Sequence, residues 1–378
     1  MSKLQDCGAT LTNASYSVEQ KIGTSTVCSA RAASLPNSVR LKSLAWCLMP
    51  LLTLVMGLGG SKVIAADRAI HVAVSRSHDV LWTEPRDLSS RNLYYGPAWR
   101  ERRPKGPVTF LSENLKGSNP KLNVVDQRGD KWRVKLGVEA RPETTATRLL
   151  WAVGYFVDED YFMSELQVKN LPAHLHRGQD FARSGNRLRN VQLERLINKE
   201  DILGKWQWKK NPFRETRELN GLRVMMALMN NWDLKNQNNS IYSNSSYPSQ
   251  KIYLVSDLGA TFGTTGFSWT QEKSKGNVKS YSHSKFIRRV TGDYVDFNVP
   301  TRPVWIRCLS VPTMISRMRM RSIGSQIPRA DARWIGSLLA RLSSEQIRDA
   351  FRAGGYSEEE VEDFATTVEQ RIEELKKL

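Results

Sequence analysis

Three polar side chains in the middle of the chain could together hold a metal ion and a substrate hydroxyl group. Asp233 and Asn238 lie five residues apart in the segment NWDLKNQN, and Asp257 follows the apolar run 252–255. Carboxylate and amide oxygens suit Mg²⁺, and a carboxylate beside a hydroxyl can orient it or accept its proton. The spacing predicts Asp233 as the base or hydroxyl-orienting residue, Asn238 as a metal ligand and Asp257 as the principal metal ligand.

Other asparagines leave the details of this loop open. Asn236 or Asn239 could replace Asn238 as a ligand if the register of the loop differs. Alternatively, the Asn-rich segment is a polar loop that turns the chain, since Asn and Asp favour turns through local hydrogen bonds. The order of loop, apolar strand and second aspartate favours a site over a plain turn.

A lysine earlier in the chain could bind the phosphates of a nucleotide. Lys135 lies in the expected strand 131–136, where alternation places Trp132, Val134 and Leu136 on one face and Lys135 on the other. Transfer of a phosphoryl group depends mainly on positioning and on neutralising charge, which a lysine at the α- and β-phosphates provides. The alternative is a lysine on a solvated face.

Glu143 is the candidate partner of Lys135. It lies in the first turn of an expected helix at 141–154, which the sequence Arg-Pro-Glu opens with proline in the first turn. From there it could reach Lys135 and hold it by an ion pair. A glutamate in a first turn is favoured by the helix dipole in any case, and Glu139 is a competing candidate.

Gly117 and Ser118 form the expected turn between the first two strands of a small sheet. The backbone N–H groups of such a turn could cover the phosphates of a nucleotide. Alternatively, the glycine simply allows a hairpin turn.

The hydrophobic pattern predicts an α+β chain in which a small antiparallel sheet precedes a mainly helical part. The expected strands are 108–111, 121–125, 131–136, 161–168, 191–196 and 252–255, with the first three forming a meander. The expected helices are 141–154, 216–230 and several after Pro328. Two pairs with capping-box spacing, Ser343 with Gln346 and Ser357 with Glu360, predict where two late helices begin.

These elements divide the chain into four regions. Residues 1–65 are interpreted as an N-terminal extension with a signal peptide, and 66–107 as an irregular lead-in with one strand at 70–74. Residues 108–215 form the sheet region, with a basic surface insertion at 172–190. Residues 216–378 form the helical region, which includes a Ser-, Thr-, Lys- and Gly-rich stretch at 264–286.

Composition predicts an exported, basic protein. An apolar run at 44–59 follows Arg40 and Lys42, and small residues before Ala66 suit cleavage near Ala65. A membrane anchor is the less favoured alternative, because a spanning helix needs about 20 apolar residues. The chain carries a net charge of +18, and removing residues 1–65 would leave +14. Such charge favours contact with anionic surfaces.

Several functional classes lack their sequence signals. The chain contains no Walker A sequence, no G-x-S-x-G segment and no histidine spacing typical of a metalloprotease. After cleavage at Ala65, Cys308 would be the one remaining cysteine, so neither an internal disulfide nor a cysteine zinc site is expected. No zinc-finger or RNA-recognition motif is present, and specific nucleic-acid binding is not expected.

The set of motifs resembles the atypical protein-kinase-like superfamily, especially HipA-like kinases, spore-coat CotH-type kinases and phosphatidylinositol kinases. The segment ETTATRLLWAVG from Glu143 is similar to the HipA-type helix, and Asp233 to Asn238 is similar to the N-x-D-x-H-x-x-N loop, with Lys235 in place of the usual histidine. The segment SDLG at Asp257 is similar to the metal-binding aspartate at a strand end. The resemblance covers roughly 108–263.

This resemblance implies a bilobal kinase-like fold that uses ATP and Mg²⁺ or Mn²⁺. It implies that Lys235 contacts the transferred phosphate. Residues 264–286 lie where an activation segment would, with a plain surface loop as an equal alternative. The expected activity is phosphotransfer to an unknown protein, lipid or small-molecule acceptor. Two alternatives remain: a kinase-like protein that binds nucleotide without catalysis or transfers AMP, and a basic envelope protein that binds anionic surfaces.

Overall fold

The computed structural model describes residues 79–378 apart from 118, 199–200, 245–246, 266–273, 301–317 and 319. All of them lie within one structural unit, His71–Leu378. The expected signal peptide, the cleavage site near Ala65 and the strand at 70–74 lie outside the described residues.

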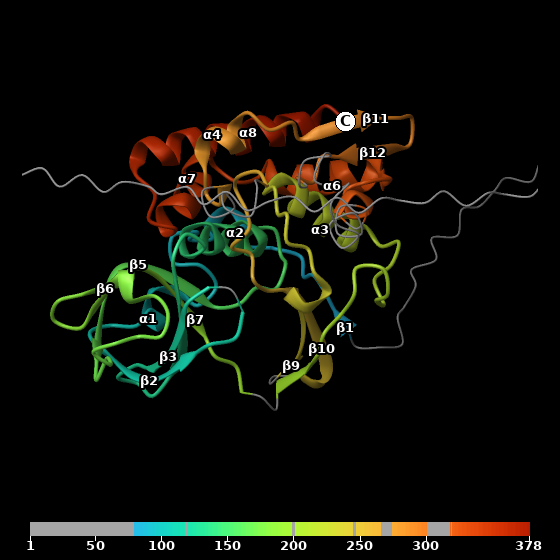
Figure 1. Ribbon diagram of the computed structural model, residues 1–378. Coiled ribbons are helices and arrows are strands. Elements are labelled where there is room, and N and C mark those ends of the chain that lie inside the picture. Colours follow the sequence, from blue (N-terminus) through green and yellow to red (C-terminus); the bar gives the residue numbers. More distant parts are fainter. Residues whose placement is uncertain are drawn as a thin grey trace, which may run out of the picture. The chain divides into compact units, whose positions relative to one another are not determined.

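A six-stranded sheet forms the first part of the described chain (Figure 1). Its strands are β2 (Val108–Asn114), β3 (Lys121–Val125), β4 (Lys131–Leu136), β5 (Asp160–Lys169), β6 (Ala182–Arg183) and β7 (Arg187–Arg195). The strand order is β4-β3-β2-β5-β7-β6, and an additional pairing of β4 with β7 closes five of the strands on themselves. The enclosed core includes Leu122, Trp132, Val134, Leu166 and Leu193, all buried.

The predicted meander of β2, β3 and β4 is confirmed, but the sheet differs from expectation in two ways. It is not wholly antiparallel, because β2 pairs in parallel with β5, with Val108 opposite Val168. Strand β7 also begins at Arg187, inside the segment predicted to be an irregular insertion. There Leu188 is buried between exposed arginines, so its alternation with charged neighbours continues the strand that begins the buried run at Val191.

Helix α2 (Ala140–Ala152) packs against strands β5 and β7, close to the prediction. It ends before Gly154, which has a φ of +97°. A Cβ atom at this position would lie 2.1 Å from the carbonyl oxygen of Thr83, so both the left-handed conformation and the close approach require glycine. The position of the helix beside the sheet is therefore fixed, and with it the position of Glu143 in the first turn.

A second sheet contains β1 (Asp79–Val80), β8 (Ile202–Gly204), β9 (Asn239–Asn244) and β10 (Tyr247–Val255), in the order β1-β10-β9-β8. The expected strand at 252–255 is the end of β10. The polar loop expected before it is wrong in part, because 239–244 form β9 and pair with β10. Residues 239–244 form a strand because their backbone pairs with β10. Their Asn, Ser and Tyr side chains do not show the hydrophobic alternation that would predict a strand from the sequence.

The rest of the chain is mainly helical. It contains α3 (Arg217–Leu228), α4 (Val278–Ser282), α6 (Arg329–Leu339), α7 (Ser344–Ala353) and α8 (Glu358–Lys376), with a small sheet of β11 (Ile287–Val290), β12 (Tyr294–Phe297) and β13 (Ile327–Pro328). Both predicted capping boxes are confirmed, at Ser343 and Ser357. The predicted α+β architecture, with the strand-rich region before the C-terminal helices, is confirmed.

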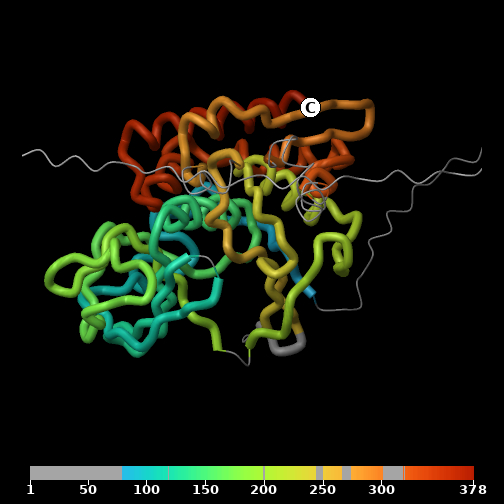
Figure 2. The backbone as a smooth tube through the Cα atoms, viewed as in Figure 1, coloured from blue at the N-terminus to red at the C-terminus, as the bar shows by residue number. Residues whose placement is uncertain are grey.

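Early and late segments of the described chain lie side by side (Figure 2). Strand β1 pairs with β10, and Gln346 of α7 donates hydrogen bonds of 2.9 Å to the carbonyl oxygens of Leu88 and Arg91. The described part of the expected lead-in contains two short helical turns, η1 (Leu88–Ser90) and α1 (Trp99–Arg102).

Arg371 of α8 joins the C-terminal helix to the end of α3. Its guanidinium group is buried and donates to the carbonyl oxygen of Leu228 at 2.6 Å and to Oδ1 of Asn230 at 3.0 Å. It also stacks over the ring of Tyr281, with its Cζ atom 4.1 Å from the ring centroid. The segment that leads to Asp233 is thus fixed by the last helix of the chain.

Among the residues that the structure describes, no helix is both long and apolar enough to cross a membrane.

Candidate active site

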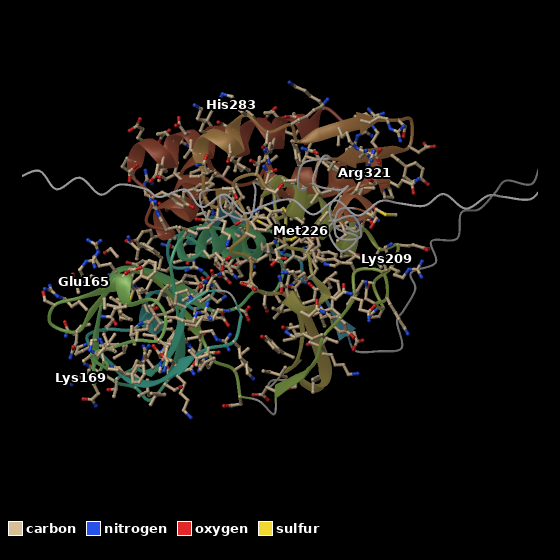
Figure 3. All side chains as sticks on the ribbon, viewed as in Figure 1. Glu165, Lys169, Lys209, Met226, His283 and Arg321 are labelled. Atoms are coloured by element: carbon tan, nitrogen blue, oxygen red, sulfur yellow. The ribbon has the colours of Figure 1, made fainter. Side chains whose placement is uncertain are left out.

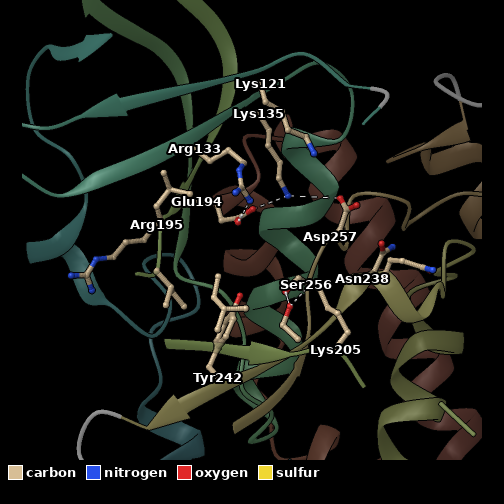
Figure 4. Close-up of a pocket in the computed structure, with 15 residues that line it drawn as sticks. Lys121, Arg133, Lys135, Glu194, Arg195, Lys205, Asn238, Tyr242, Ser256 and Asp257 are labelled. Carbon is tan, nitrogen blue, oxygen red and sulfur yellow. Dashed lines mark hydrogen bonds and ion pairs between the residues drawn. The ribbon is translucent and has the colours of Figure 1, made fainter. Parts of the chain in front are cut away.

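Lys135 lies at the centre of a buried cluster of charges (Figure 4). Its Nζ atom is 2.6 Å from Oε1 of Glu143, 2.8 Å from Oε2 of Glu194 and 3.8 Å from Oδ1 of Asp257. The alternation in β4 that buries Trp132 and Val134 turns Lys135 to the opposite face, as predicted. The structure thus joins Lys135, Glu143 and Asp257, which the sequence places up to 122 positions apart.

The cluster holds more negative than positive charge around Lys135. Burial would lower the pKa of the Lys135 ammonium, but Glu143, Glu194 and Asp257 together raise it well above its usual range. Burial, together with the nearby carboxylates of Asp257 and Glu194, raises the pKa of Glu143 to about 8. The Oε2 atom of Glu143 is buried and has no hydrogen-bond partner within the described part of the chain. A bound cation or a proton would therefore be favourable here.

Glu194, at the end of β7, is a member of the cluster that the sequence analysis missed. Its Oε1 atom accepts a hydrogen bond of 2.8 Å from Arg133, while Oε2 contacts Lys135. Burial would raise its pKa, but Lys135 and Arg133 outweigh this effect and hold it below its usual range. Its position opposite Arg133 depends on the β4–β7 pairing, and no local sequence pattern indicates that pairing.

Asp158 is a second carboxylate that the sequence analysis missed. Tyr242 of β9 donates a hydrogen bond of 3.2 Å to its Oδ1 atom. Burial and the nearby charge of Glu194 raise the pKa of Asp158 to about 7. Tyr242 lines the same cavity as Lys135, whereas Asp158 does not, so Asp158 acts on the site by holding the Tyr242 hydroxyl group in place.

The loop from Asp233 to Asn238 ends in the short turn η4 (Asn236–Asn238). The amide nitrogen of Asn238 donates to the carbonyl oxygen of Asp233 at 2.8 Å and lies 3.4 Å from its Oδ2 atom. These contacts occupy the amide nitrogen of Asn238, so its amide oxygen is the atom that could bind a metal ion. Lys235 is exposed, and its Nζ atom lies 2.8 Å from Oδ1 of Asp233.

Asp257 follows β10 with a φ of +56°, in the left-handed region. Residues other than glycine seldom adopt this conformation, and such positions cluster at functional sites. The side chain of Asp257 is 40% exposed, so its carboxylate remains accessible. Gly259 packs against Glu139, where an added Cβ atom would lie 2.6 Å from the Cβ of Glu139.

Glu139, the competing candidate to pair with Lys135, instead has other partners. Its carboxylate contacts Nζ of Lys275 and the amide nitrogen of Asn119. These contacts join the β2–β3 turn, the start of α2 and the segment after Gly263. Lys135 pairs with Glu143, as the sequence interpretation favoured.

A cavity of ≈ 230 Å³, here called the site cavity, lies between the first and second sheets. Cationic side chains occupy one part of its wall, polar groups from the Asp233–Asn238 loop and β10 another, and Leu196, Ile197 and Ile202 a third. Its lining residues include Lys121, Arg133, Lys135, Glu194, Lys205, Asn238, Tyr242, Ser256 and Asp257 (Figure 4).

The remaining candidate residues lie differently with respect to this cavity. Asp233 and Lys235 are next to it through Asn238 but do not line it. Gly117 does not line it either; its carbonyl oxygen accepts a hydrogen bond of 2.8 Å from Arg177. Ser118 lies outside the described residues. The structure therefore brings the lysine, the asparagine and Asp257 together but gives Gly117 no place in the cavity wall.

The oxygen atoms present fit a divalent metal bound together with phosphates. Among the described residues, no three His, Cys, Asp or Glu side chains gather into a metal site of their own. Asp257 and Asn238 both line the site cavity, and Mg²⁺ typically takes only one or two carboxylates while substrate phosphates and water supply its other ligands. These two side chains would hold the ion.

The structure is similar to a crystal structure of the Helicobacter pylori proinflammatory kinase CtkA. The TM-score is 0.41 and the sequence identity 12%, over 72% of this chain and 98% of that chain. No protein-family model matches the chain, and no curated protein matches it by sequence.

Proposed function

We propose that this protein is a phosphotransferase that uses ATP and Mg²⁺ or Mn²⁺ to phosphorylate a hydroxyl group. The observation that carries the proposal is the position of Lys135. It is buried, paired with Glu143 at 2.6 Å and 3.8 Å from Asp257, in the wall of a cavity that Asn238 also lines. A buried lysine, its carboxylate partner and two oxygen ligands are the groups that phosphoryl transfer requires.

Each side chain has a role that follows from its surroundings. Lys135 binds the α- and β-phosphates, and Glu143 holds its ammonium group in place. The apolar side chains of Leu196, Ile197 and Ile202 offer a surface for the base of the nucleotide. The bound metal–nucleotide supplies the phosphoryl group and neutralises charge on it.

Asp233 orients the acceptor hydroxyl and takes its proton. Its carboxylate is held by Lys235 at 2.8 Å and its backbone carbonyl by Asn238 at 2.8 Å, so the loop is fixed on two sides. Lys235 is exposed, so its ammonium group can exchange the contact with Asp233 for one with a transferred phosphate. Asn238 thus links Asp233, the proposed base, to the part of the site cavity where Asp257 would bind the metal.

Thermal stability of the full chain with ATP and Mg²⁺ tests the nucleotide site. Ligand at about 100 times its dissociation constant adds roughly 2.7 kcal/mol to the free energy of unfolding. We expect a metal-dependent rise in Tm that Asp257→Ala abolishes and that Asp363→Ala, a change at an exposed aspartate of α8, retains. No rise in the unchanged protein would contradict the proposal.

Transfer of label from [γ-³²P]ATP to protein, lipid and small-molecule acceptors tests the reaction itself. We expect transfer that is lost in Asp233→Ala, with ATP binding retained. Stable binding of ATP without consumption would instead favour a kinase-like protein that binds nucleotide. Transfer of label from [α-³²P]ATP would favour AMP transfer.

A further inference from the structure

A groove lies beside the site cavity on the other side of the η4 turn. It consists of two adjoining cavities, of ≈ 890 Å³ and ≈ 520 Å³, which share Trp208, Lys209, Ser322 and Ile323 as lining residues. We call this the lateral groove. Its volume exceeds that of the site cavity, so it can hold an extended ligand of several residues.

The lateral groove and the site cavity share one structural element. Gln237 and Asn238 of η4 line the site cavity, whereas Asn236 of the same turn lines the lateral groove. The Oδ1 atom of Asn236 accepts a hydrogen bond of 3.4 Å from the backbone N–H of Trp208. A ligand in the groove therefore lies next to the loop that carries Asp233.

The wall of the lateral groove contains a buried donor without an acceptor. Trp208 is 7% exposed and lines both of the adjoining cavities, and its indole Nε1 atom has no hydrogen-bond partner among the residues that the structure describes. Indole N–H groups that are buried nearly always find an acceptor. A ligand whose carbonyl or carboxylate oxygen reached this atom would satisfy it.

The charges of the groove favour an anionic ligand. Lys209, labelled in Figure 3, is exposed and makes no ion pair with any described residue. Arg214 is also exposed, and its one ion pair with a described residue, Glu215, spans 3.8 Å. Glu215 is the one carboxylate among the described lining residues. Arg223 is committed to backbone carbonyls, including that of Ile323 at 2.7 Å.

The groove also has apolar walls. Leu219 and Ile323 are buried, while Tyr294 and Met318 are 49% and 64% exposed and border the same space. A nucleic-acid surface would need a longer series of cations to follow successive phosphates. Two cations beside apolar pockets and an indole donor suit a peptide, which offers backbone carbonyls and separate side chains.

We propose that the lateral groove binds the phosphate acceptor, an acidic peptide segment that presents a serine or threonine hydroxyl to Asp233. This proposal rests on the phosphotransferase function proposed above. Acidic side chains of the segment contact Lys209 and Arg214, and a peptide oxygen accepts from Trp208. The hydroxyl oxygen forms a bond to the γ-phosphorus of ATP as the bond to ADP breaks, and its proton passes to Asp233.

Binding of a labelled peptide to the full chain without nucleotide tests the groove by itself. The probe is fluorescein-EEEEASAEEEE, compared with the same peptide carrying Lys for Glu and with single-stranded DNA of equal charge, at constant ionic strength. Fluorescence anisotropy should show that the acidic peptide binds at least about tenfold more tightly than either comparison.

Charge reversal identifies the surface involved. We expect the double variant Lys209→Glu/Arg214→Glu to weaken peptide binding about tenfold or more, and Trp208→Phe to weaken it about threefold to tenfold by removing the indole donor. Lys279→Glu, an exposed lysine of α4 that does not line the groove, is the matched control and should bind as the unchanged protein does.

The thermal shift with ATP and Mg²⁺ separates this proposal from the one it rests on. A normal ATP shift with no selective peptide binding, or with equal weakening by Lys279→Glu, would overturn the groove assignment and leave the phosphotransferase proposal standing. Tighter binding of the DNA would also overturn it. Selective peptide binding without an ATP shift would contradict phosphotransfer while supporting a peptide-binding groove.

Discussion

Replacing Lys135 with methionine should destabilise the folded protein strongly, because it removes a cation that several carboxylates share. Nζ of Lys135 lies 2.6 Å from Glu143 and 2.8 Å from Glu194, whose side chains are 3% and 11% exposed. Methionine fills a similar volume without charge, so Glu143 loses its counter-ion and Glu194 keeps only Arg133, while both carboxylates stay largely buried. Breaking a buried ion pair on one side typically costs about 3–5 kcal/mol.

The size of the effect can be measured as a change in Tm. A unit of this size changes its Tm by about 2 °C per kcal/mol, so Lys135→Met should lower the Tm by roughly 6–10 °C at pH 8. The loss should be smaller at pH 5, because Glu143 is then protonated. The double variant Lys135→Met/Glu143→Gln should recover part of the lost stability, since one of the uncompensated charges is gone.

Circular dichroism melts of the full chain at pH 5 and pH 8 make the test. Lys131→Met is the matched control, because Lys131 is exposed on the same strand. A Tm within about 1 °C of the unchanged protein at pH 8 would refute the reasoning. So would a loss of equal size at both pH values, because it would point to lost packing and not to uncompensated charge.

Three further changes test other parts of the structure by thermal or denaturant unfolding. Glu143→Gln should flatten the pH dependence of stability. The pKa of Glu143 is raised from 4.5 to about 8, so between these pH values the folded protein holds a proton that the unfolded chain releases. The free energy of unfolding should therefore fall as the pH rises from 4.5 to about 8 in the unchanged protein only. A fall of equal slope in both proteins would contradict this. Gly259→Ala should lower stability by about 1–3 kcal/mol, because its Cβ atom would press on Glu139, and a neutral result would show that α2 shifts freely. Ser357→Ala should remove the capping box of α8 and cost about 1 kcal/mol, whereas the exposed Ser337→Ala should cost less.

Local sequence patterns predict the elements that local forces determine. The Trp132, Val134 and Leu136 alternation correctly placed Lys135 on the opposite face of its strand, and Ser357 correctly marked the start of a helix. Such features depend on neighbours a few residues away. The roles proposed for Lys135 and Asp257 in binding nucleotide and metal stay predictions.

Features that depend on distant pairing could not be predicted from the sequence in the same way. Glu194 reaches Lys135 because β7 pairs with β4, and this pairing closes the first sheet across more than 50 residues. The polar segment 239–244 becomes a strand because β10 is available beside it. Trp208 lies between the expected strand 191–196 and the expected helix 216–230, and its unpaired donor becomes visible only when its surroundings are known.

The contacts of Arg371 have a consequence for the order in which the protein is completed. This side chain fixes Leu228 and Asn230, immediately before the Asp233 loop, yet it lies 138 positions after Asp233 in the sequence. During synthesis the earlier parts of a chain emerge and fold first. The loop therefore cannot take its final form until α8 has left the ribosome, and the site stays unfinished while the helical region is being made.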